Sequence, residues 1–377
     1  MILLALGGCA DDVDRDSWGI PDHYPSLVVP QDNPMTVEKV ELGRYLFYDF
    51  RLSVNGKRSC GVCHEDKKGF TDGFVRALGA YDDPHPRNTL SLTDVAWREN
   101  LGWTRLAPED LEHQLLSPLT GEQPILEMGM TEDLLVERLE ATELYPPLFE
   151  AAFPDEPISL ETTGKAIASF ERTLISGTSP YDDFLQGGQL DPSAERGREL
   201  FFGDEALCSR CHGGLWLDSP TSPTGRVTAR HGWFNTGLYD IDGHGSYPEI
   251  EQGLYAETGL REDMGRFRTP SLRNVALSGP WTHDGSVGDL GDLLDAYARG
   301  GRDVQSGPNP GDGANNPFKS PLVDGFPMSP GDREDLLAFL EALTDRAMVE
   351  DPALQNPFCV EVAGEVTNEP CLEPEPF

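Results

Sequence analysis

Two cysteines three positions apart, followed directly by a histidine, occur twice in this chain of 377 residues. The two sets are Cys60, Cys63 and His64, and Cys208, Cys211 and His212. Covalent haem attachment needs two thiols on one tight turn, to form thioethers with the vinyl groups, and an adjacent imidazole that reaches the iron. Both sets meet this requirement. The sequence therefore predicts two covalently bound c-type haems, with His64 and His212 as iron ligands.

Two other uses of such a motif fit the rest of the chain less well. A zinc site needs four ligands, and the next histidine after His64 is His85, while the next after His212 is His231. A thioredoxin-like cysteine pair follows a strand in a βαβ unit, and no such pattern precedes either motif. The spacing and the surroundings favour haem over zinc and over thiol redox chemistry.

The regions ahead of the two motifs resemble each other. "ELGRYLF" (Glu41 to Phe47) precedes the first motif, and "ERGRELF" (Glu195 to Phe201) precedes the second. We interpret this as duplication of one unit, giving an N-terminal haem domain at 30–185 and a C-terminal haem domain at 190–347. The Gly, Pro and Ser residues of 186–195 are typical of a linker or the start of a helix.

Helical patterns outnumber strand patterns. Apolar residues recur at helical spacing in 108–119, 162–175 and 333–344. Glycine (40 residues) and proline (31 residues) are plentiful, which is typical of long loops. The expected fold class is mainly α, with two cytochrome c-like haem domains related by duplication.

The chain is strongly acidic, with 29 basic and 65 acidic residues and a formal charge of −36. Such a surface repels phosphate backbones and anionic lipid headgroups, which argues against nucleic acid as a partner. A neutral or basic protein, or a small substrate, suits it better. The acidity also suits a role in solubility alone.

Both ends of the chain carry cysteines outside the haem motifs. "LGGC", ending at Cys9, resembles a bacterial lipobox, and the apolar residues before it are too few to span a bilayer and lack a preceding basic region. We interpret 1–29 as a truncated lipoprotein signal and tail, so that Cys9 would be the only membrane anchor of an exported, periplasmic or outer-membrane lipoprotein. Residues 348–377 read as an acidic, proline-rich tail, where Cys359 and Cys371 could form a disulfide or remain free thiols.

The chain resembles the bacterial diheme cytochrome c peroxidase/MauG superfamily over 30–347. The resemblance rests on the paired CxxCH motifs, "HPRNTLSL" (85–92), "LEHQLLSPL…ILEMG" (111–129) and "FRTPSLRNVALSGPWTHDGS" (267–286). Within this superfamily it looks most similar to the methanobactin-associated MbnH type, diheme enzymes encoded beside a copper-binding partner.

For the first haem, the resemblance implies a peroxide-reactive iron. The family's peroxidases place a distal histidine shortly before Pro-Arg-Asn, and Ala80 stands at that position, so the His64 haem is expected to be five-coordinate. His85, next to Pro86, is the alternative sixth ligand.

The resemblance also implies an acid–base group for peroxide cleavage, because the family uses a glutamate in its "EMG" loop together with a glutamine and a proline. These match Glu127, Gln114 and Pro118. The stretch between Pro118 and Glu127 is longer than is usual in the family, so Glu122 competes for the role. Burial against a haem would raise the pKa of either carboxyl group.

For the second haem, the choice of sixth ligand depends on residues 289–301. Leu290, Leu293, Leu294 and Tyr297 fall at helical spacing, so Tyr297 lies on the apolar face. Counting from the "WTHDG" motif, Tyr297 matches the position that holds methionine in the peroxidases and tyrosine in MauG-like enzymes. A phenolate favours oxidised iron, whereas a thioether raises the potential. Met264 and Met328 are the rival ligands.

Two further assignments follow from the resemblance. Trp103 matches the family's tryptophan between the haems, which relays electrons or holes. The superfamily also binds calcium between its domains through an asparagine side chain and two backbone carbonyls, which here match Asn88, Ser278 and Pro280.

The resemblance therefore implies a MauG/MbnH-like oxidase that uses hydrogen peroxide to oxidise aromatic residues, tryptophan above all, of a partner protein, with a copper-binding protein encoded nearby as the candidate partner. The alternatives are a diheme peroxidase that takes electrons from a small redox protein, and a diheme electron carrier with both irons saturated.

Overall fold

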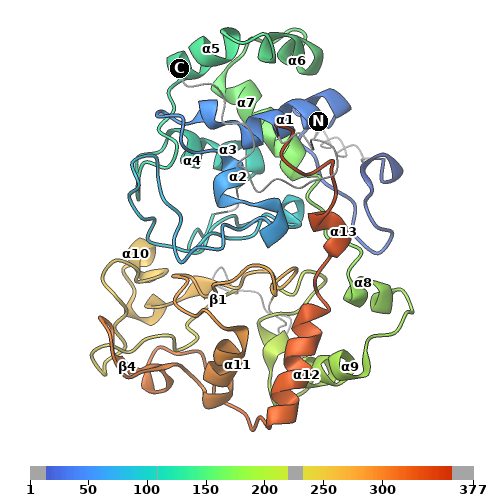
Figure 1. Cartoon of the computed structure of the whole chain (residues 1–377). Coiled ribbons are helices and arrows are strands. Elements are labelled where there is room, and N and C mark those ends of the chain that lie inside the picture. Colours follow the sequence, from blue (N-terminus) through green and yellow to red (C-terminus); the bar gives the residue numbers. More distant parts are fainter. Residues whose placement is uncertain (1–13, 108, 220–231, 359–377) are drawn as a thin grey trace, which may run out of the picture.

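The computed structural model describes residues 14–107, 109–219 and 232–358. Cys9, Cys359 and Cys371, with the expected lipid anchor and disulfide, lie outside these residues. The described chain forms an upper and a lower half, one around each CxxCH motif (Figure 1). The helices of the upper half are α1 (Val37–Tyr48), α2 (Cys60–Cys63), α3 (Leu111–Gln114), α4 (Leu116–Thr120), α5 (Glu132–Glu140), α6 (Tyr145–Ala152) and α7 (Leu160–Glu171).

The lower half has fewer helices and contains the few strands of the described chain. Its helices are α9 (Pro192–Phe202), α10 (Tyr255–Thr258), α11 (Leu290–Arg299) and α12 (Pro330–Glu341), while α8 (Pro180–Leu185) and α13 (Arg346–Val349) lie near the junction of the halves (Figure 1). Two antiparallel pairs, β1 (Trp233–Phe234) with β2 (Phe267–Arg268) and β3 (Asp303–Val304) with β4 (Gly311–Asp312), have two residues per strand. Short 3₁₀ turns lie at 16–18, 50–52, 66–68, 95–97, 208–210, 261–263 and 313–315.

Each half is built on one crossed helix pair, α1 with α7 and α9 with α12. Local sequence begins these helices. The Thr36 side chain accepts from the backbone N–H of Lys39 before α1, and Ser159 and Ser329 form capping boxes before α7 and α12. Asp191 and Pro192 start α9, so the expected linker ends in a helix cap.

A glycine allows each crossing to be close. A methyl group on Gly43 in α1 would overlap the Ala166 carbonyl oxygen of α7, and one on Gly197 in α9 would overlap the Asp335 carbonyl oxygen of α12. These glycines occupy the same position in "ELGRYLF" and "ERGRELF". The repeated sequence therefore marks the point where two backbones meet without a side chain between them.

The duplication extends to loops that the sequence comparison did not pair. Phe70 and Leu217 lie six and five residues after the histidines of their CxxCH motifs and both have a positive φ. Asp94 and Asn274 share a positive φ inside "TLSLTDVAW" (89–97) and "TPSLRNVAL" (269–277). The prediction of a mainly α, duplicated haem fold is confirmed. The exact domain boundaries remain a prediction.

Three expected helices differ in detail from their sequence patterns. The helical pattern of 108–119 is broken at Leu115 into α3 and α4, whereas 162–175 and 333–344 contain the ends of α7 and α12. The described start of the expected tail does not project from the molecule. Met348 and Leu354 are buried in the core of the upper half, and the Leu354 carbonyl accepts a hydrogen bond from the Tyr48 hydroxyl. Within the described chain, no helix has the length and hydropathy that crossing a lipid bilayer requires.

Candidate haem sites and active site

The first CxxCH motif forms the short helix α2, packed on the end of α1. A Cβ at Gly61 would collide with the Tyr48 ring, so a glycine between the two cysteines lets the motif sit flat on that aromatic side chain. The His64 backbone N–H donates to the Cys60 carbonyl at 2.8 Å. This turn holds both thiols and the imidazole within one compact unit.

Both predicted proximal histidines are held in the same way. His64 Nδ1 lies 2.9 Å from the Phe70 carbonyl oxygen, and His212 Nδ1 lies 2.9 Å from that of Leu217. Because a carbonyl only accepts, each Nδ1 carries the proton and each Nε2 keeps its lone pair for a metal. Burial lowers the pKa of His64, and that of His212 to about 4. Both imidazoles are therefore neutral, as iron ligands must be.

The cysteine thiols are poorly suited to redox chemistry of their own. Burial raises the pKa of Cys63, Cys208 and Cys211 to about 12, and that of Cys60 further still. A reactive cysteine pair needs a lowered pKa, because the thiolate is the nucleophile. Thioether formation with a porphyrin suits these buried sulfurs better.

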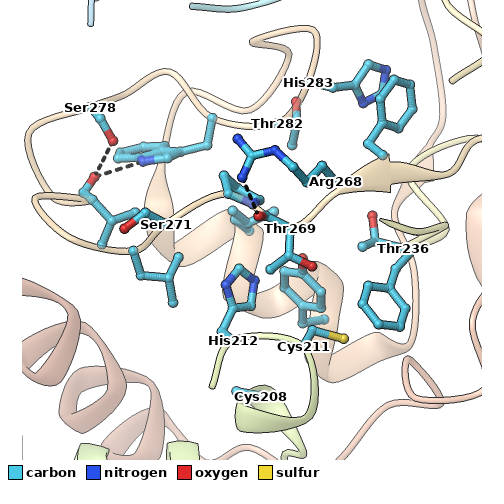
Figure 2. Close-up of a pocket in the computed structure, with 18 of the residues that line it drawn as sticks. Cys208, Cys211, His212, Thr236, Arg268, Thr269, Ser271, Ser278, Thr282 and His283 are labelled. Atoms are coloured by element: carbon cyan, nitrogen blue, oxygen red, sulfur yellow. Dashed lines mark hydrogen bonds between the residues drawn. The ribbon is translucent and has the colours of Figure 1, made fainter. Parts of the chain in front are cut away.

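A cavity of about 270 Å³ opens beside the second motif. Cys208, Cys211 and His212 line it, and Figure 2 shows the His212 ring directed toward Thr269 from the loop that carries the cysteines. Helix α11 contributes its apolar face, because Leu290, Leu293, Leu294 and Tyr297 line the same cavity.

Tyr297 is placed as its helical phase predicts. Burial raises the pKa of its phenol, and the nearby Cys211 and Cys208 add to this. The rival ligands lie elsewhere. Met264 is buried in a cluster with Trp103 and Tyr247, Met328 packs on the core around α9 and α12, and neither is among the described residues that line the cavity.

The cavity continues into the junction between the halves, where four further predicted residues meet. Trp103, Asn88, Ser278 and Pro280 all line it. The Trp103 indole N–H donates to the Asn88 carbonyl at 2.9 Å, and the ring lies edge-on to His283 at 6.5 Å. The Asn88 amide nitrogen donates to the Phe74 carbonyl at 2.9 Å, so the Asn88 amide oxygen points away from that carbonyl. Trp103 therefore lies between the two halves, as expected.

Near the first motif, the loop that carries Glu127 is fastened to α4. The Met128 N–H donates to the Pro118 carbonyl at 3.1 Å, which brings two of the predicted residues together, and Gln114 ends α3 just before. Glu127 is near enough to Cys60 and Cys63 for its charge to raise the pKa of both thiols. Burial raises the pKa of Glu127 itself. The competing Glu122 is exposed.

Ala80, which stands where the related peroxidases have a distal histidine, lies against the loop that carries Glu127. Ala80 is fully buried, and its N–H donates to the Leu126 carbonyl at 2.9 Å. His85 approaches from the following turn, with Nε2 4.0 Å from a Glu127 carboxylate oxygen and Nδ1 within 3.1 Å of the Arg87 backbone. Nε2 of His85 therefore faces the Glu127 carboxylate.

Two residues that line the cavity, His283 and Arg268, were not singled out by the sequence as site residues. His283 is stacked on Phe267 with centroids 3.6 Å apart, and its Nε2 has no hydrogen-bond partner among the described residues. Burial lowers its pKa to about 4, and burial lowers the pKa of Arg268 to about 10. The "WTHDG" motif was the available signal, but it served only as a landmark for counting to Tyr297.

The residues present fit two c-type haems. Each half offers two thiols on one turn, a neutral imidazole whose Nδ1 is held by a backbone carbonyl, and an apolar helix pair, and the second half adds the cavity.

Comparison with known proteins agrees with this geometry. The family model described as di-haem cytochrome c peroxidase matches residues 37–190. The methylamine utilization protein MauG of Methylorubrum extorquens is 37% identical over 321 residues, covering 84% of this chain and 81% of that protein. The chain belongs to the MauG/diheme cytochrome c peroxidase family. It is therefore a diheme oxidoreductase that acts on peroxide, and the resemblance seen in the sequence is confirmed.

Other relatives of this diheme enzyme represent both branches of the family. The cytochrome c551 peroxidase of Pseudomonas aeruginosa is 29% identical, covering 89% of this chain and 86% of that protein. A crystal structure described as a MauG-like protein associated with microbial copper homeostasis superposes with a TM-score of 0.85 at 44% identity, covering 90% of this chain and 99% of that one. The diheme peroxidase BthA of Burkholderia thailandensis shares the fold, with a TM-score of 0.61 at 21% identity, covering 86% and 91%.

Proposed function

We propose that this diheme enzyme uses hydrogen peroxide to oxidise tryptophan side chains of a partner protein. The observation that carries the proposal is the difference between the two haem sites. A carboxylate, Glu127, faces the first CxxCH motif, whereas a phenol, Tyr297, shares a cavity with His212. One site is equipped to move a proton and the other to hold an oxidised iron.

At the first site, Cys60 and Cys63 would anchor the haem and His64 Nε2 would bind its iron. The bound haem supplies the two-electron reduction of peroxide. Glu127 is proposed to take the proton from one peroxide oxygen and return it to the leaving oxygen. Burial raises the pKa of Glu127 above its ordinary value, which makes this carboxylate a better proton acceptor than an exposed glutamate. Pro118 fixes the Glu127 loop through its carbonyl, and Gln114 stands at the end of the adjacent helix.

We propose that His64 alone would bind the iron of the first haem. Ala80 offers only a methyl group where the related peroxidases have an imidazole. His85, the alternative ligand, has Nδ1 held near the Arg87 backbone and turns Nε2 toward Glu127. In this arrangement His85 would interact with the Glu127 carboxylate rather than with the iron.

At the second site, His212 and Tyr297 would bind the haem iron, and Cys208 and Cys211 would form the thioethers. The phenol pKa is raised by burial in the protein alone, so coordination to the cation is what would make the phenolate. An anionic oxygen ligand stabilises the higher oxidation states of iron. Trp103, at the junction of the halves, is proposed to carry holes between the sites.

We also propose a calcium ion beside Trp103. Asn88, Ser278 and Pro280 line one cavity, and an amide oxygen with two backbone carbonyls is a donor set that a hard cation prefers. An ion there would stiffen the contact through which the Trp103 indole donates to the Asn88 carbonyl.

The 44% identity to a MauG-like protein associated with copper homeostasis favours a copper-binding protein as the partner. The charge of −36 favours a neutral or basic docking surface on it. We place the enzyme in the periplasm, where c-type haems and their partners occur, with Cys9 as a lipid anchor.

The test mixes the ferric holoenzyme with one equivalent of peroxide, without prior reduction, in the presence of a copper-binding protein taken as the candidate partner. The expected results are near-infrared absorption from the oxidised diheme state and conversion of a partner tryptophan to kynurenine, found by peptide mass spectrometry. A partner recovered unmodified while peroxide is consumed would refute the tryptophan oxidation.

The second candidate is a peroxidase supplied with electrons by a small redox protein, and the relation to cytochrome c551 peroxidase supports it. It predicts that peroxide reacts only after the second haem has been reduced. Stopped-flow mixing of peroxide with the fully ferric and the half-reduced enzyme separates the two functions.

A further inference from the structure

A second aromatic group, apart from Trp103, joins the two halves. Trp97 of the upper half and Trp216 of the lower half are stacked, with centroids 5.7 Å apart and planes 28° apart. Tyr24 lies edge-on to both rings, at 5.2 and 5.9 Å. Among the described residues that line the cavity of Trp103, neither member of this pair is found. The stack is therefore separate from the proposed relay between the haems.

The fold does not require aromatic residues at these positions. In the duplicated loops, Trp97 corresponds to Leu277, and Trp216 corresponds to Gly69. Each correspondence is fixed by matching geometry, since the Ser91 hydroxyl donates to the Gly69 carbonyl at 2.6 Å and the Ser271 hydroxyl donates to the Trp216 carbonyl at 2.8 Å. The other copy of these loops thus carries leucine and glycine where this pair has tryptophan.

Short hydrogen-bonded routes connect the stack to both proximal histidines. The Leu217 carbonyl, which accepts from His212 Nδ1, belongs to the residue after Trp216. In the other half, His64 Nδ1 donates to the Phe70 carbonyl, and Phe70 follows Gly69 in the chain. The Gly69 carbonyl accepts a hydrogen bond from the hydroxyl of Ser91, which lies six residues before Trp97. Covalent bonds and hydrogen bonds carry electron tunnelling better than gaps do, so the lower half offers the shorter path.

The surroundings of the stack suit a stable positive charge. The indole N–H groups of both Trp97 and Trp216 are buried without a hydrogen-bond partner among the described residues. An oxidised indole is a strong acid, and without an acceptor its proton stays in place, so the hole remains mobile. The Arg98 guanidinium lies 5.3 Å from the Trp216 ring and is ion-paired with Asp218, which offsets its charge.

Tyr24 provides a place where that hole can settle. Its hydroxyl donates to the Ser176 carbonyl at 2.6 Å and lies 3.3 Å from an Asp94 carboxylate oxygen. Burial raises the pKa of Asp94 to about 7, so this carboxylate can accept the phenol proton near neutral pH. Electron loss from Tyr24 would then leave a neutral radical and a protonated Asp94.

We propose that Trp97 and Trp216 together form a one-electron oxidation site, where a hole from the peroxide-oxidised haems spreads over both rings. In the overall step the O–O bond of one peroxide breaks, and two electrons and two protons give two waters. One of those electrons comes from the stack, which becomes a radical cation, and the other remains missing from the haem pair. A one-electron donor, for which ascorbate is the probe, refills the stack.

The experiment freezes the ferric holoenzyme within milliseconds of adding one equivalent of peroxide and records the electron paramagnetic resonance spectrum. Protein made with ring-deuterated tryptophan identifies an indole radical by narrowing of the signal. Trp97→Phe and Trp216→Phe should each lower the indole signal at least about fivefold. Trp18→Phe, a partly buried tryptophan of the same cluster, should retain it.

Variants are compared only where their ferric haem spectra and thermal midpoints match the parent enzyme, and either of the two stack variants suffices. A second readout uses excess peroxide without a reductant, followed by peptide mass spectrometry. Oxygen adducts should concentrate on Trp97 and Trp216 and disappear when ascorbate is present. An unchanged indole signal in a folded stack variant, or adducts confined to Trp103, would overturn the inference.

The inference depends on peroxide oxidation of the haems but not on the identity of the protein substrate. Failure of the partner's tryptophan to be modified, with the indole radical present, would count against the proposed function alone. Loss of the radical with substrate oxidation intact would count against the stack alone.

Discussion

The two haem halves share their proximal side and differ on the side where chemistry is expected. In both, a glycine sits at the crossing of the main helices, and a backbone carbonyl fixes the imidazole at 2.9 Å. Beyond that frame, the upper half presents Glu127 and the lower half Tyr297. Duplication thus preserved the residues that would hold a haem, while the residues proposed to act on its other side differ between the halves.

The largest expected effect is loss of proton transfer at the upper site. Glu127→Gln should slow the reaction of the ferric enzyme with peroxide by about 10²- to 10⁴-fold, because an amide cannot take and return the proton. Burial raises the Glu127 pKa, so the wild-type rate should rise with pH through an apparent pKa above the ordinary 4.5, and the variant should lose this dependence.

Stopped-flow absorbance across pH 4.5 to 8 gives both readings. Glu122→Gln, which alters the exposed competitor, is the matched control and should behave as the parent enzyme. If the loss appears in that variant instead, the acid–base role belongs to Glu122, and the asymmetry between the halves needs another residue on the upper side.

The next effect concerns the oxygen ligand of the lower half. Tyr297→Phe should abolish the near-infrared absorption after peroxide, because no anionic ligand then supports the second oxidised iron. Tyr297→Met should raise the reduction potential of that haem by on the order of 0.1 V or more. A spectroelectrochemical titration measures this. A potential that shifts on Met264→Leu and not at Tyr297 would reassign the ligand.

A smaller effect tests what the halves share. Gly43→Ala and Gly197→Ala should each lower the free energy of unfolding by about 1–3 kcal/mol, since a methyl group overlaps a backbone carbonyl at the helix crossing. Gly288→Ala adds the same methyl group where no atom lies within 4 Å and should be nearly neutral. The thermal midpoints of the three haem-loaded variants measure these losses of stability. Equal losses in all three would remove the argument for a conserved crossing.

Sequence reasoning succeeded where the information was local. Spacing within five residues identified both CxxCH motifs, and helical phase placed Tyr297 on the face of α11 that lines the cavity. It did not find contacts between loops distant in sequence. The approach of His85 to Glu127 and the stacking of Trp97 on Trp216 depend on how separate loops fold over each other, and no periodicity records that.

The junction of the halves shows the same limit. Residues after 347 read as a tail because they are acidic and rich in proline, yet Met348 and Leu354 fill the upper core. Composition describes what a segment exposes on average. It does not reveal that the side chains of Met348 and Leu354 pack into a core.

The smallest expected effect comes from a residue on which the two helix pairs disagree. Superposing the crossings places Glu171 of α7 where α12 has Leu340, a residue that lines the lower cavity. Glu171 is 3% exposed, its Oε2 has no partner among the described residues, and burial raises its pKa to about 8. The folded protein therefore keeps a proton that the unfolded chain releases above its ordinary pKa of 4.5.

Between pH 4.5 and 8 the folded state holds more protons at this site than the unfolded state, so stability contributed by Glu171 falls as pH rises. Glu171→Gln removes this slope and should gain on the order of 2 kcal/mol relative to the parent enzyme between pH 6 and pH 8. The exposed Glu334→Gln should track the parent at both values. Thermal midpoints of the ferric holoenzymes, measured across this range, give the comparison. If Glu171→Gln shows the same slope as the parent enzyme, then Glu171 is ionised in the folded protein and is bound by the haem or a nearby group. The position of Leu340 in the lower half would then be held in the upper half by a partnered carboxylate rather than by a buried, protonated carboxyl group.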